Sequence, residues 1–386
     1  MSTELITANH ASGLAAAMAG RANRTARGFG SGIYPITPQT ECVELLSSLD
    51  IEKGHVVKVE SEHSAMAVCM GFSLSGARSF TASSSNGLAY MVENVYAAAF
   101  FRLPIVMMAV NRTLGPPWNI WADHGDGMML RDTGWIQFYC EDNQEVFDTI
   151  LLAFHLGEDA RLLLPVLVCQ DSFVLSHTLM ETDVPDQEVV DAYLPTMNLP
   201  HMVTDRPRTF GGLDFPHETE VHRRQLAEAM DRVPAVYAEV QDAFEHAFGR
   251  RPADPVVSYR MGDAEVVVIS MGTLGATART AVDRLRDQGI RAGSLRVRMF
   301  RPFPAEPLRQ LLAGARHIAV IDRDLSPGLG GVLWSELKTF YDGDAVVQNY
   351  MMGLGGGDVR PEHLVQVVED VTRRDQATTP QILEVA

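Results

Sequence analysis

The sequence predicts an α/β protein built from two domains. Short apolar runs alternate with segments that carry apolar residues at helical spacing, the pattern of a mostly parallel sheet covered by helices. At 386 residues the chain is longer than one hydrophobic core usually fills. Hydrophobic residues make up 46% of it and charged residues 21%, as in ordinary globular proteins. We expect α/β domains at residues 1–190 and 261–386, joined by residues 191–260.

The elements of the first domain follow from this alternation. Strands covered on both faces are expected to be continuously apolar or β-branched. Runs of this kind occupy residues 56–59, 79–82, 105–110 and 163–168. Helical spacing predicts helices at residues 64–75, 87–101 and 143–157, the last of them starting at Asn143.

The segment from 191 to 260 changes character. It is polar and punctuated by Pro195, Pro200, Pro207 and Pro216, and a helical pattern follows at residues 224–248. We therefore expect an extended connector with one helix. Long irregular segments often wrap a neighbouring subunit or shape a site.

The second domain is predicted from Ala264 onward, where a buried strand runs into a glycine turn. Its further elements are a helix at 277–288, a strand at 291–298, a helix ending at Ala315 and a strand at 317–322.

Charge and cysteine content exclude several functions. The chain carries 49 acidic and 32 basic residues, and this net charge of -17 disfavours nucleic acid as a partner. No stretch approaches the roughly 20 apolar residues of a membrane-spanning helix, and the N-terminus has no secretory pattern, so we expect a cytoplasmic protein without membrane contact. The four cysteines stand far apart, so we expect no iron–sulfur cluster or zinc site in this chain.

Two loops carry candidate site residues. In residues 30–41, Pro35 and Pro38 stiffen a loop that presents Tyr34 and Thr37; alternatively, Thr37 is the N-cap of a helix with Pro38 in its first turn. In residues 57–71, acidic residues stand between a strand and a helix. They are either helix caps or a carboxyl group that bonds a heterocyclic nitrogen from an apolar cleft.

Arg112 follows directly on the strand ending at Val110, where ligands of parallel α/β sheets collect. A guanidinium there can bind a small carboxylate through two parallel hydrogen bonds, in bidentate geometry. The alternative is a structural salt bridge with Asp123 or Asp126. His124, between acidic residues, fits a structural histidine better than a catalytic base.

Glycine motifs give no cofactor site of their own. Residues 125–127 read GDG, but the asparagine that would complete a magnesium-diphosphate motif is missing. The clusters at 328–331 and 353–357 match no nucleotide fingerprint and are explained by turns. We therefore assign no metal or nucleotide site to this chain.

Taken together, several ordered motifs resemble the α subunit of pyruvate:ferredoxin oxidoreductases and their relatives. The motifs are YPITP (34–38), ESEHSA (60–65), LPIVMMAVNR (103–112), NIWADHGD (119–126), RDTGWIQFY (131–139), NQE (143–145), VPDQEVVD (184–191) and RPFP (301–304). The resemblance implies a pyrimidine-binding thiamine-diphosphate domain followed by a transketolase-C-like domain, and CoA-dependent oxidative decarboxylation of a 2-oxoacid.

The resemblance also implies partners. Thiamine diphosphate is shared with a β subunit that supplies the diphosphate and Mg²⁺ motif, while γ and ferredoxin-like δ subunits complete the complex. The [4Fe–4S] clusters lie in partner subunits and pass electrons to ferredoxin, or to NAD through a further subunit. A non-redox thiamine transferase subunit and a non-catalytic assembly subunit are the alternatives.

Carried over to this sequence, the resemblance assigns the cofactor contacts to Glu62, Tyr34, Pro35 and Ile36. Glu62 is similar to the family glutamate that bonds N1′ of the aminopyrimidine. A carboxyl group on N1′ favours the tautomer whose 4′-nitrogen removes the C2 proton of the thiazolium ring. The expected catalytic residues are Glu62, Arg112 and Thr37.

Thr37, Arg112, Leu114 and Gly115 are implied to contact the substrate, with Arg112 clamping its carboxylate. The sequence after Arg112 is TLGPPWN, where pyruvate enzymes typically carry something like ALSAPIN. Glycine in place of serine at position 115 could open space. Pyruvate and a bulkier acid such as phenylglyoxylate therefore compete as substrates.

Overall fold

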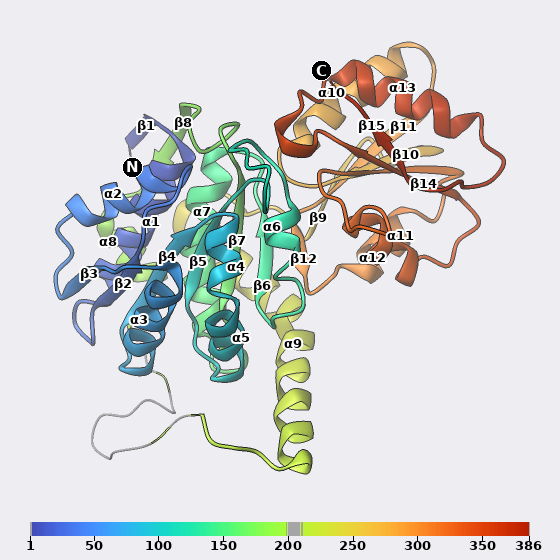
Figure 1. Ribbon diagram of the computed structural model, residues 1–386. Coiled ribbons are helices and arrows are strands. Elements are labelled where there is room, and N and C mark those ends of the chain that lie inside the picture. The colour runs from blue at the N-terminus through green and yellow to red at the C-terminus, as the bar shows by residue number, and fades with distance from the viewer. Residues whose placement is uncertain (1, 198, 200–208, 210, 386) are drawn as a thin grey trace.

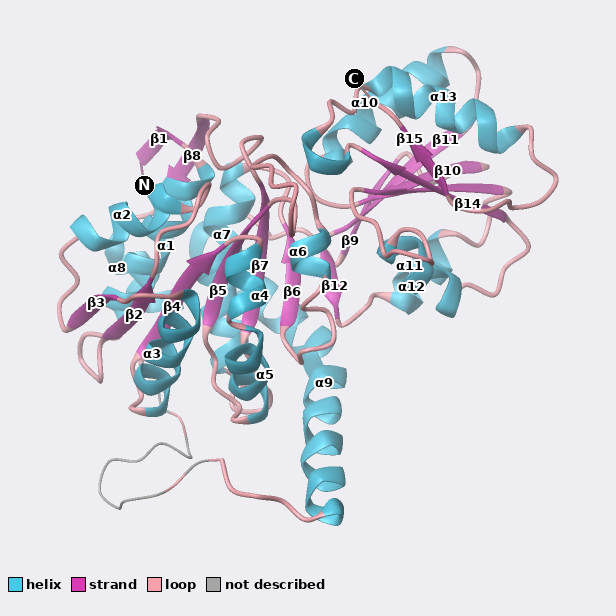
Figure 2. Ribbon diagram, viewed as in Figure 1, coloured by secondary structure: helices cyan, strands magenta, loops and turns pink. Residues whose placement is uncertain are grey.

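The computed structural model describes residues 2–197, 199, 209 and 211–385. They form two lobes, each with a central sheet covered by helices, and a long helix runs down beside the first lobe (Figure 1). The sheets have seven and six strands, and a two-stranded ribbon pairs β1 (Ser2–Ile6) with β8 (Met180–Val184). Figure 2 shows helices on both faces of each sheet, which confirms the predicted α/β class.

The seven-stranded sheet has the order β12-β6-β7-β5-β4-β2-β3. Its strands are β2 (Phe29–Ile33), β3 (Gly54–Lys58), β4 (Arg78–Ser83), β5 (Val106–Asn111), β6 (Ile136–Tyr139), β7 (Val166–Asp171) and β12 (Met299–Arg301). All neighbours pair in parallel except β12, which runs antiparallel to β6. The four predicted strands are β3, β4, β5 and β7. The expectation of cover on both faces is wrong for β3, because it is a partly exposed edge strand.

Before the connector, the described residues of the first lobe form eight helices. They are α1 (Ala8–Ala22), α2 (Thr40–Ser48), α3 (Glu62–Leu74), α4 (Asn86–Tyr90), α5 (Val92–Phe100), α6 (Gly125–Met128), α7 (Asn143–Glu158) and α8 (Gln187–Tyr193). The helix expected at 87–101 is two helices, because helical geometry is interrupted at Met91. Helix α7 starts at Asn143 as predicted, and Asp142 caps it by accepting the Glu145 N–H at 2.7 Å.

The predicted connector contains a longer helix than its sequence pattern indicated. Helix α9 (Pro216–Phe248) starts at a proline, which suits the first turn because its missing N–H has no partner there. Its buried residues pack against α7, α8 and α5, so this helix is part of the first lobe. Pro200 and Pro207 lie outside the described residues.

The six-stranded sheet has the order β15-β14-β13-β10-β11-β9. Its strands are β9 (Val256–Tyr259), β10 (Val266–Ser270), β11 (Ala292–Val297), β13 (His317–Asp322), β14 (Val346–Met352) and β15 (Gln381–Leu383). Its helices are α10 (Leu274–Asp287), α11 (Ala305–Leu311), α12 (Val332–Phe340) and α13 (Pro361–Thr372). Only β9 runs antiparallel to its neighbour. Among the described helices, none combines the length and apolar character that crossing a bilayer requires.

Candidate active site

The candidate residues lie at one edge of the first sheet. Strands β5, β4, β2 and β3 are neighbours and run in parallel, so their carboxyl ends meet at the same edge. Thr37 follows β2, Glu62 follows β3 and Arg112 follows β5. The fold therefore brings together three segments that are distant in sequence, at the place where α/β sheets bind ligands.

The loop after β2 is held from two sides. The Gln39 side chain donates to the Tyr34 carbonyl at 2.8 Å, and Asn9 donates to the Pro38 carbonyl at 2.7 Å. Helix α2 begins at Thr40 with Gln39 at its N-cap, so the expectation that Thr37 caps this helix is wrong. Residues 36–39 form a turn of their own, closed by the Gln39 N–H on the Ile36 carbonyl at 2.9 Å. Thr37 is thus exposed and free of a capping role.

Within this loop, the predicted cofactor contacts differ in exposure. Tyr34 and Ile36 are half-buried, whereas Pro35 and Thr37 are exposed. The Thr37–Pro38 peptide bond is cis. The loop therefore presents alternating covered and open side chains at the sheet edge.

Glu62 is a buried carboxylate at the first position of α3, with 7% of its surface exposed. The N-cap is Ser61, whose hydroxyl accepts the Ser64 N–H at 3.2 Å, so Glu62 does not serve as the side-chain cap. Its carboxylate faces Gly87, where an added Cβ would lie 2.6 Å from Oε1. Among the described residues, none forms a hydrogen bond or ion pair with this carboxylate.

A buried charge without a partner is costly, although the helix dipole favours an acidic group in the first turn of α3. The neighbouring Glu60 differs, because it is exposed and accepts the Ser64 hydroxyl at 2.5 Å. Of the two acidic residues, only Glu62 has the burial and the open hydrogen-bonding capacity that fit a heterocyclic ring nitrogen.

The Arg112 guanidinium is also buried and under-satisfied. Only 8% of the residue is exposed, Nη1 donates to the Asn119 carbonyl at 3.2 Å, and Nε has no partner in the described part of the chain. Burial lowers the pKa of Arg112. The alternative of a salt bridge with Asp123 or Asp126 is not formed, and Asp126 instead accepts the backbone N–H of Arg112 at 3.1 Å. The side chain therefore keeps donors for a small carboxylate.

The loop after Arg112 is closed on itself. The Thr113 hydroxyl donates to the Asn119 carbonyl at 2.8 Å and accepts the Asn119 N–H at 3.2 Å. Leu114 and Trp118 are 40% and 69% exposed. Gly115 has a φ of +80°, and an added Cβ would meet open space. Glycine is thus favoured at position 115 by its backbone conformation as well as by any need for room.

His124 lies at the contact between the lobes. Its Nε2 is 2.7 Å from Asp171, which also accepts Arg323 Nη1 at 2.9 Å and the Thr273 N–H at 3.1 Å. Burial alone would raise the pKa of Asp171, but His124 and Arg323 hold it well below its usual range. His124 is therefore a structural residue, as its sequence context favoured.

Two motifs of the resemblance have structural roles that the sequence did not reveal. In NQE, Glu145 accepts Arg296 Nη1 at 2.9 Å and Arg298 Nε at 2.6 Å. Burial alone would raise the pKa of Glu145, but the two guanidinium groups hold it at about 2. In RPFP, Arg301 ends β12 and donates to Glu336 and to the Arg131 carbonyl. These residues join the two lobes.

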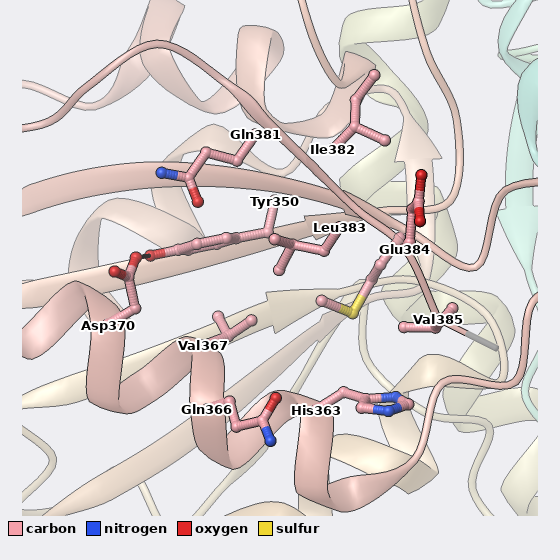
Figure 3. Close-up of a pocket in the computed structure, with 11 residues that line it drawn as sticks. Tyr350, His363, Gln366, Val367, Asp370, Gln381, Ile382, Leu383, Glu384 and Val385 are labelled. Carbon is pink, nitrogen blue, oxygen red and sulfur yellow. Dashed lines mark hydrogen bonds between the residues drawn. The ribbon is translucent and has the colours of Figure 1, made fainter.

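A separate cavity in the second lobe is lined by none of the candidate residues. This cavity, of about 360 Å³, lies between α13 and the β14–β15 edge. Figure 3 shows Asp370 near the Tyr350 hydroxyl, with His363 in another part of the lining. In the described residues, no group of three or more His, Cys, Asp or Glu side chains is arranged to hold a metal ion.

Family models match most of the chain. Residues 27–242 match the model described as pyruvate flavodoxin/ferredoxin oxidoreductase, thiamine diphosphate-binding, which is more than half of the sequence. The chain belongs to this family. Residues 264–364 match pyruvate:ferredoxin oxidoreductase core domain II. The resemblance is thus confirmed, and the chain is an α-type subunit of a thiamine-diphosphate-dependent 2-oxoacid oxidoreductase.

Curated relatives span nearly the same length. Pyruvate synthase subunit PorA of Thermotoga maritima is 43% identical over 345 residues, covering 87% of this chain and 88% of the relative. PorA of Methanocaldococcus jannaschii is 41% identical, covering 90% of each. Ketoisovalerate oxidoreductase subunit VorA of Pyrococcus abyssi is also 41% identical, covering 88% of each.

Solved structures share the fold. The 2-oxoglutarate:ferredoxin oxidoreductase of Magnetococcus marinus aligns with a TM-score of 0.74 at 20% identity, over 95% of this chain and 65% of that chain. This chain thus spans about two-thirds of that larger polypeptide. A split-gene transketolase aligns with a TM-score of 0.56 at 14% identity, over 96% of this chain and 99% of that one.

Proposed function

We propose that Glu62 activates thiamine diphosphate and that Arg112 anchors the carboxylate of a 2-oxoacid, which the assembled complex converts to acyl-CoA and CO₂. One observation carries the proposal: Glu62 and Arg112 are buried at the same sheet edge, and neither has an ionic partner among the described residues. Each group therefore has unused capacity for a ligand.

When bound, thiamine diphosphate supplies the nucleophilic carbon and the electron sink of the reaction. In this chain, Glu62 holds the proton at the ring nitrogen N1′, since it is the buried acid of the 60–63 segment. Tyr34, Pro35 and Ile36 border the cofactor from the stiff loop after β2. These residues exclude water from one side of the ring and orient it.

Arg112 would bind the substrate carboxylate through its free donors, while the exposed Thr37 hydroxyl contacts the substrate from the opposite loop. Such binding orients the 2-oxo group toward the cofactor and lowers the entropy cost of the encounter. Leu114 and Gly115 form the remaining wall. The open space at Gly115 supports a 2-oxoacid bulkier than pyruvate, such as a branched or aryl acid, and pyruvate is the competing substrate.

A partner chain completes this site in the proposal. A β subunit contributes the diphosphate and Mg²⁺ motif, and γ and ferredoxin-like δ subunits accompany it. Partner [4Fe–4S] clusters carry electrons to ferredoxin, or to NAD through a further subunit. Exposed aromatic side chains support a covering chain here, because Tyr90 and Trp118 are 61% and 69% exposed beside the site loops.

The test is the Glu62→Gln substitution in the assembled complex, with turnover measured across a panel of 2-oxoacids. We expect turnover to fall about 10²- to 10⁴-fold, the usual contribution of general acid–base catalysis. The matched control is Glu60→Gln, which removes the exposed neighbouring carboxylate and should leave turnover within about twofold. Near-normal turnover of Glu62→Gln would falsify the proposed role.

A further inference from the structure

Asp126 is a fully buried carboxylate that the proposed chemistry does not use. It is the second residue of the short helix α6 and belongs to the GDG sequence, which lacks the rest of a magnesium motif. Its Oδ2 accepts the backbone N–H groups of Ser85 at 2.8 Å and Arg112 at 3.1 Å. Its Oδ1 accepts the Asn111 side chain at 2.8 Å and the Gly127 N–H at 2.7 Å.

These four donors come from three segments, one of which is α6 itself. Ser85 lies in the loop after β4, whereas Asn111 and Arg112 lie at the end of β5. The Ser85 backbone has a φ of +50°, a region that non-glycine residues rarely adopt unless neighbouring contacts hold them there. The bond to Asp126 is such a contact, and the Ser85 hydroxyl adds a second one to the Thr113 carbonyl.

Both proposed site groups depend on these two segments. The loop after β4 continues from Ser85 into Gly87, which is the residue that packs against the Glu62 carboxylate. The other segment carries Arg112 itself. The Asp126 carboxylate therefore connects the segment that packs against Glu62 to the backbone of Arg112.

We propose that Asp126 is a positioning residue. Its ionised carboxylate fixes the separation between Arg112 and the segment after β4, in which Gly87 packs against Glu62. The inference rests on the proposed function, because it assumes that Glu62 and Arg112 act on the bound cofactor and substrate. Only the ionised form offers acceptors to all four donors, since a protonated oxygen would direct its hydrogen at an N–H group.

Ionisation of Asp126 is finely balanced. Burial raises its pKa to about 6, and the hydrogen bonds from Asn111, Ser85 and Arg112 limit the rise. The titratable groups that face it are Asp123, the Arg112 guanidinium, Tyr139 and Cys169. Burial raises the pKa of both Tyr139 and Cys169, so these two stay neutral. Acidification toward pH 6 should therefore protonate Asp126 and weaken the hydrogen bonds that hold the segment after β4 to the end of β5.

The first experiment compares Asp126→Asn with the native complex, measuring KM for the 2-oxoacid and kcat separately. We expect KM to rise at least tenfold, because an amide presents its NH₂ group to two donors. The control is Asp322→Asn, since Asp322 is an equally buried carboxylate that accepts the Leu333 N–H and the Asn349 side chain in the other lobe. It should lower the melting temperature while leaving KM unchanged. Equal KM values in all three proteins would overturn the proposal.

A milder variant keeps the proposal testable if Asp126→Asn does not assemble. Asn111→Ala removes one of the four bonds that favour the ionised carboxylate, so the acid limb of the kcat/KM–pH profile should move to higher pH. A residue with a merely structural role would lower stability without moving that limb. An unmoved limb, or a wild-type profile without an acid limb near pH 6, contradicts the assignment.

The outcome also separates this inference from the proposed function. If Glu62→Gln abolishes turnover while Asn111→Ala leaves the pH profile in place, only the role of Asp126 fails. If Glu62→Gln retains turnover, the site itself is wrong, whatever Asp126 does.

Discussion

Two regions of this molecule bury charged side chains and use them in opposite ways. At the domain joint, which comprises Glu145, Arg296 and Arg298 together with Asp171 and Arg323, each carboxylate has at least one guanidinium partner. At the site edge, Glu62 and Arg112 are similarly buried but have no such partner among the described residues. The same residue types therefore hold the lobes together in one place and remain open to ligands in the other.

The difference follows from the cost of burying charge. A buried ion pair loses hydration but recovers much of it through attraction and hydrogen bonds, so breaking it leaves an uncompensated charge. An unpaired buried charge destabilises the free protein by its desolvation cost, and a bound ligand of opposite or complementary polarity offsets this cost. Substitutions should therefore affect stability at the joint and activity at the site edge.

The largest stability effect is expected for Glu145→Ala. This change leaves Arg296 and Arg298 buried without their carboxylate, so the free energy of unfolding should fall by about 3–5 kcal/mol. Chemical denaturation of both proteins measures it. As a control, Glu306→Ala removes an exposed partner of Arg309 and should cost no more than about 1 kcal/mol. Equal losses in the two variants would mean that burial does not set the contribution of these pairs.

The pH dependence of stability should report the same joint. The pKa of Glu145 is about 2 in the folded protein and 4.5 in the reference state, so its contribution is present above pH 4.5 and is lost as pH falls toward 2. The shift corresponds to about 3 kcal/mol. Denaturant titrations of the native protein and Glu145→Gln should converge over this range. A difference that stays constant between pH 5 and pH 3 would exclude this carboxylate as the source.

A smaller effect is expected at Thr273. Its hydroxyl and its N–H both donate to Asp171 across the joint. Thr273→Val keeps the N–H bond but removes the hydroxyl bond to Asp171, together with the longer one that the hydroxyl accepts from Arg323 Nη1 at 3.3 Å. Loss of a hydrogen bond to a charged group should cost about 1.5–3 kcal/mol. Thr280→Val on the exposed side of α10 is the control, since its hydroxyl bonds only the Ala276 carbonyl. Thermal melts that rank the two variants the other way would contradict the comparison.

The smallest stability change is expected at the site edge. Glu62→Gln keeps the shape of a side chain that has no hydrogen-bond or ionic partner among the described residues, so the free energy of unfolding should change by no more than about 0.5 kcal/mol. Calorimetry of the same variant used for the turnover test measures this. A loss of several kcal/mol would reveal that Glu62 is a structural anchor.

The sequence predicted most of the fold where a segment's own pattern decides its structure. The strand at 317–322 and the helix at 143–157 agree with β13 and α7 to within one residue. Helix α1 was not predicted, because its small residues are buried on nearly every side and give no helical periodicity. Strand β12 was not predicted either, since three residues carry too little pattern and its partner Phe138 lies far upstream.

The candidate site was predicted from the positions of Glu62 and Arg112 at strand ends, with their roles supplied by the family resemblance. What the sequence could not indicate was which polar groups would find partners. Asp126 was set aside with an incomplete motif, although its four bonds depend on three segments meeting in space. Glu145 reads as a helix-start residue, and its arginine partners follow about 150 residues later.

Strand β12 also determines when the first sheet can be finished. Its three residues are drawn from the segment that follows β11, yet they close the edge of the sheet beside β6. During synthesis, the β6 edge stays uncovered until residue 301 of 386 has been made. A fragment ending before Met299 would expose that edge to pairing with other chains. A fragment expressed to separate the lobes should therefore extend past Arg301.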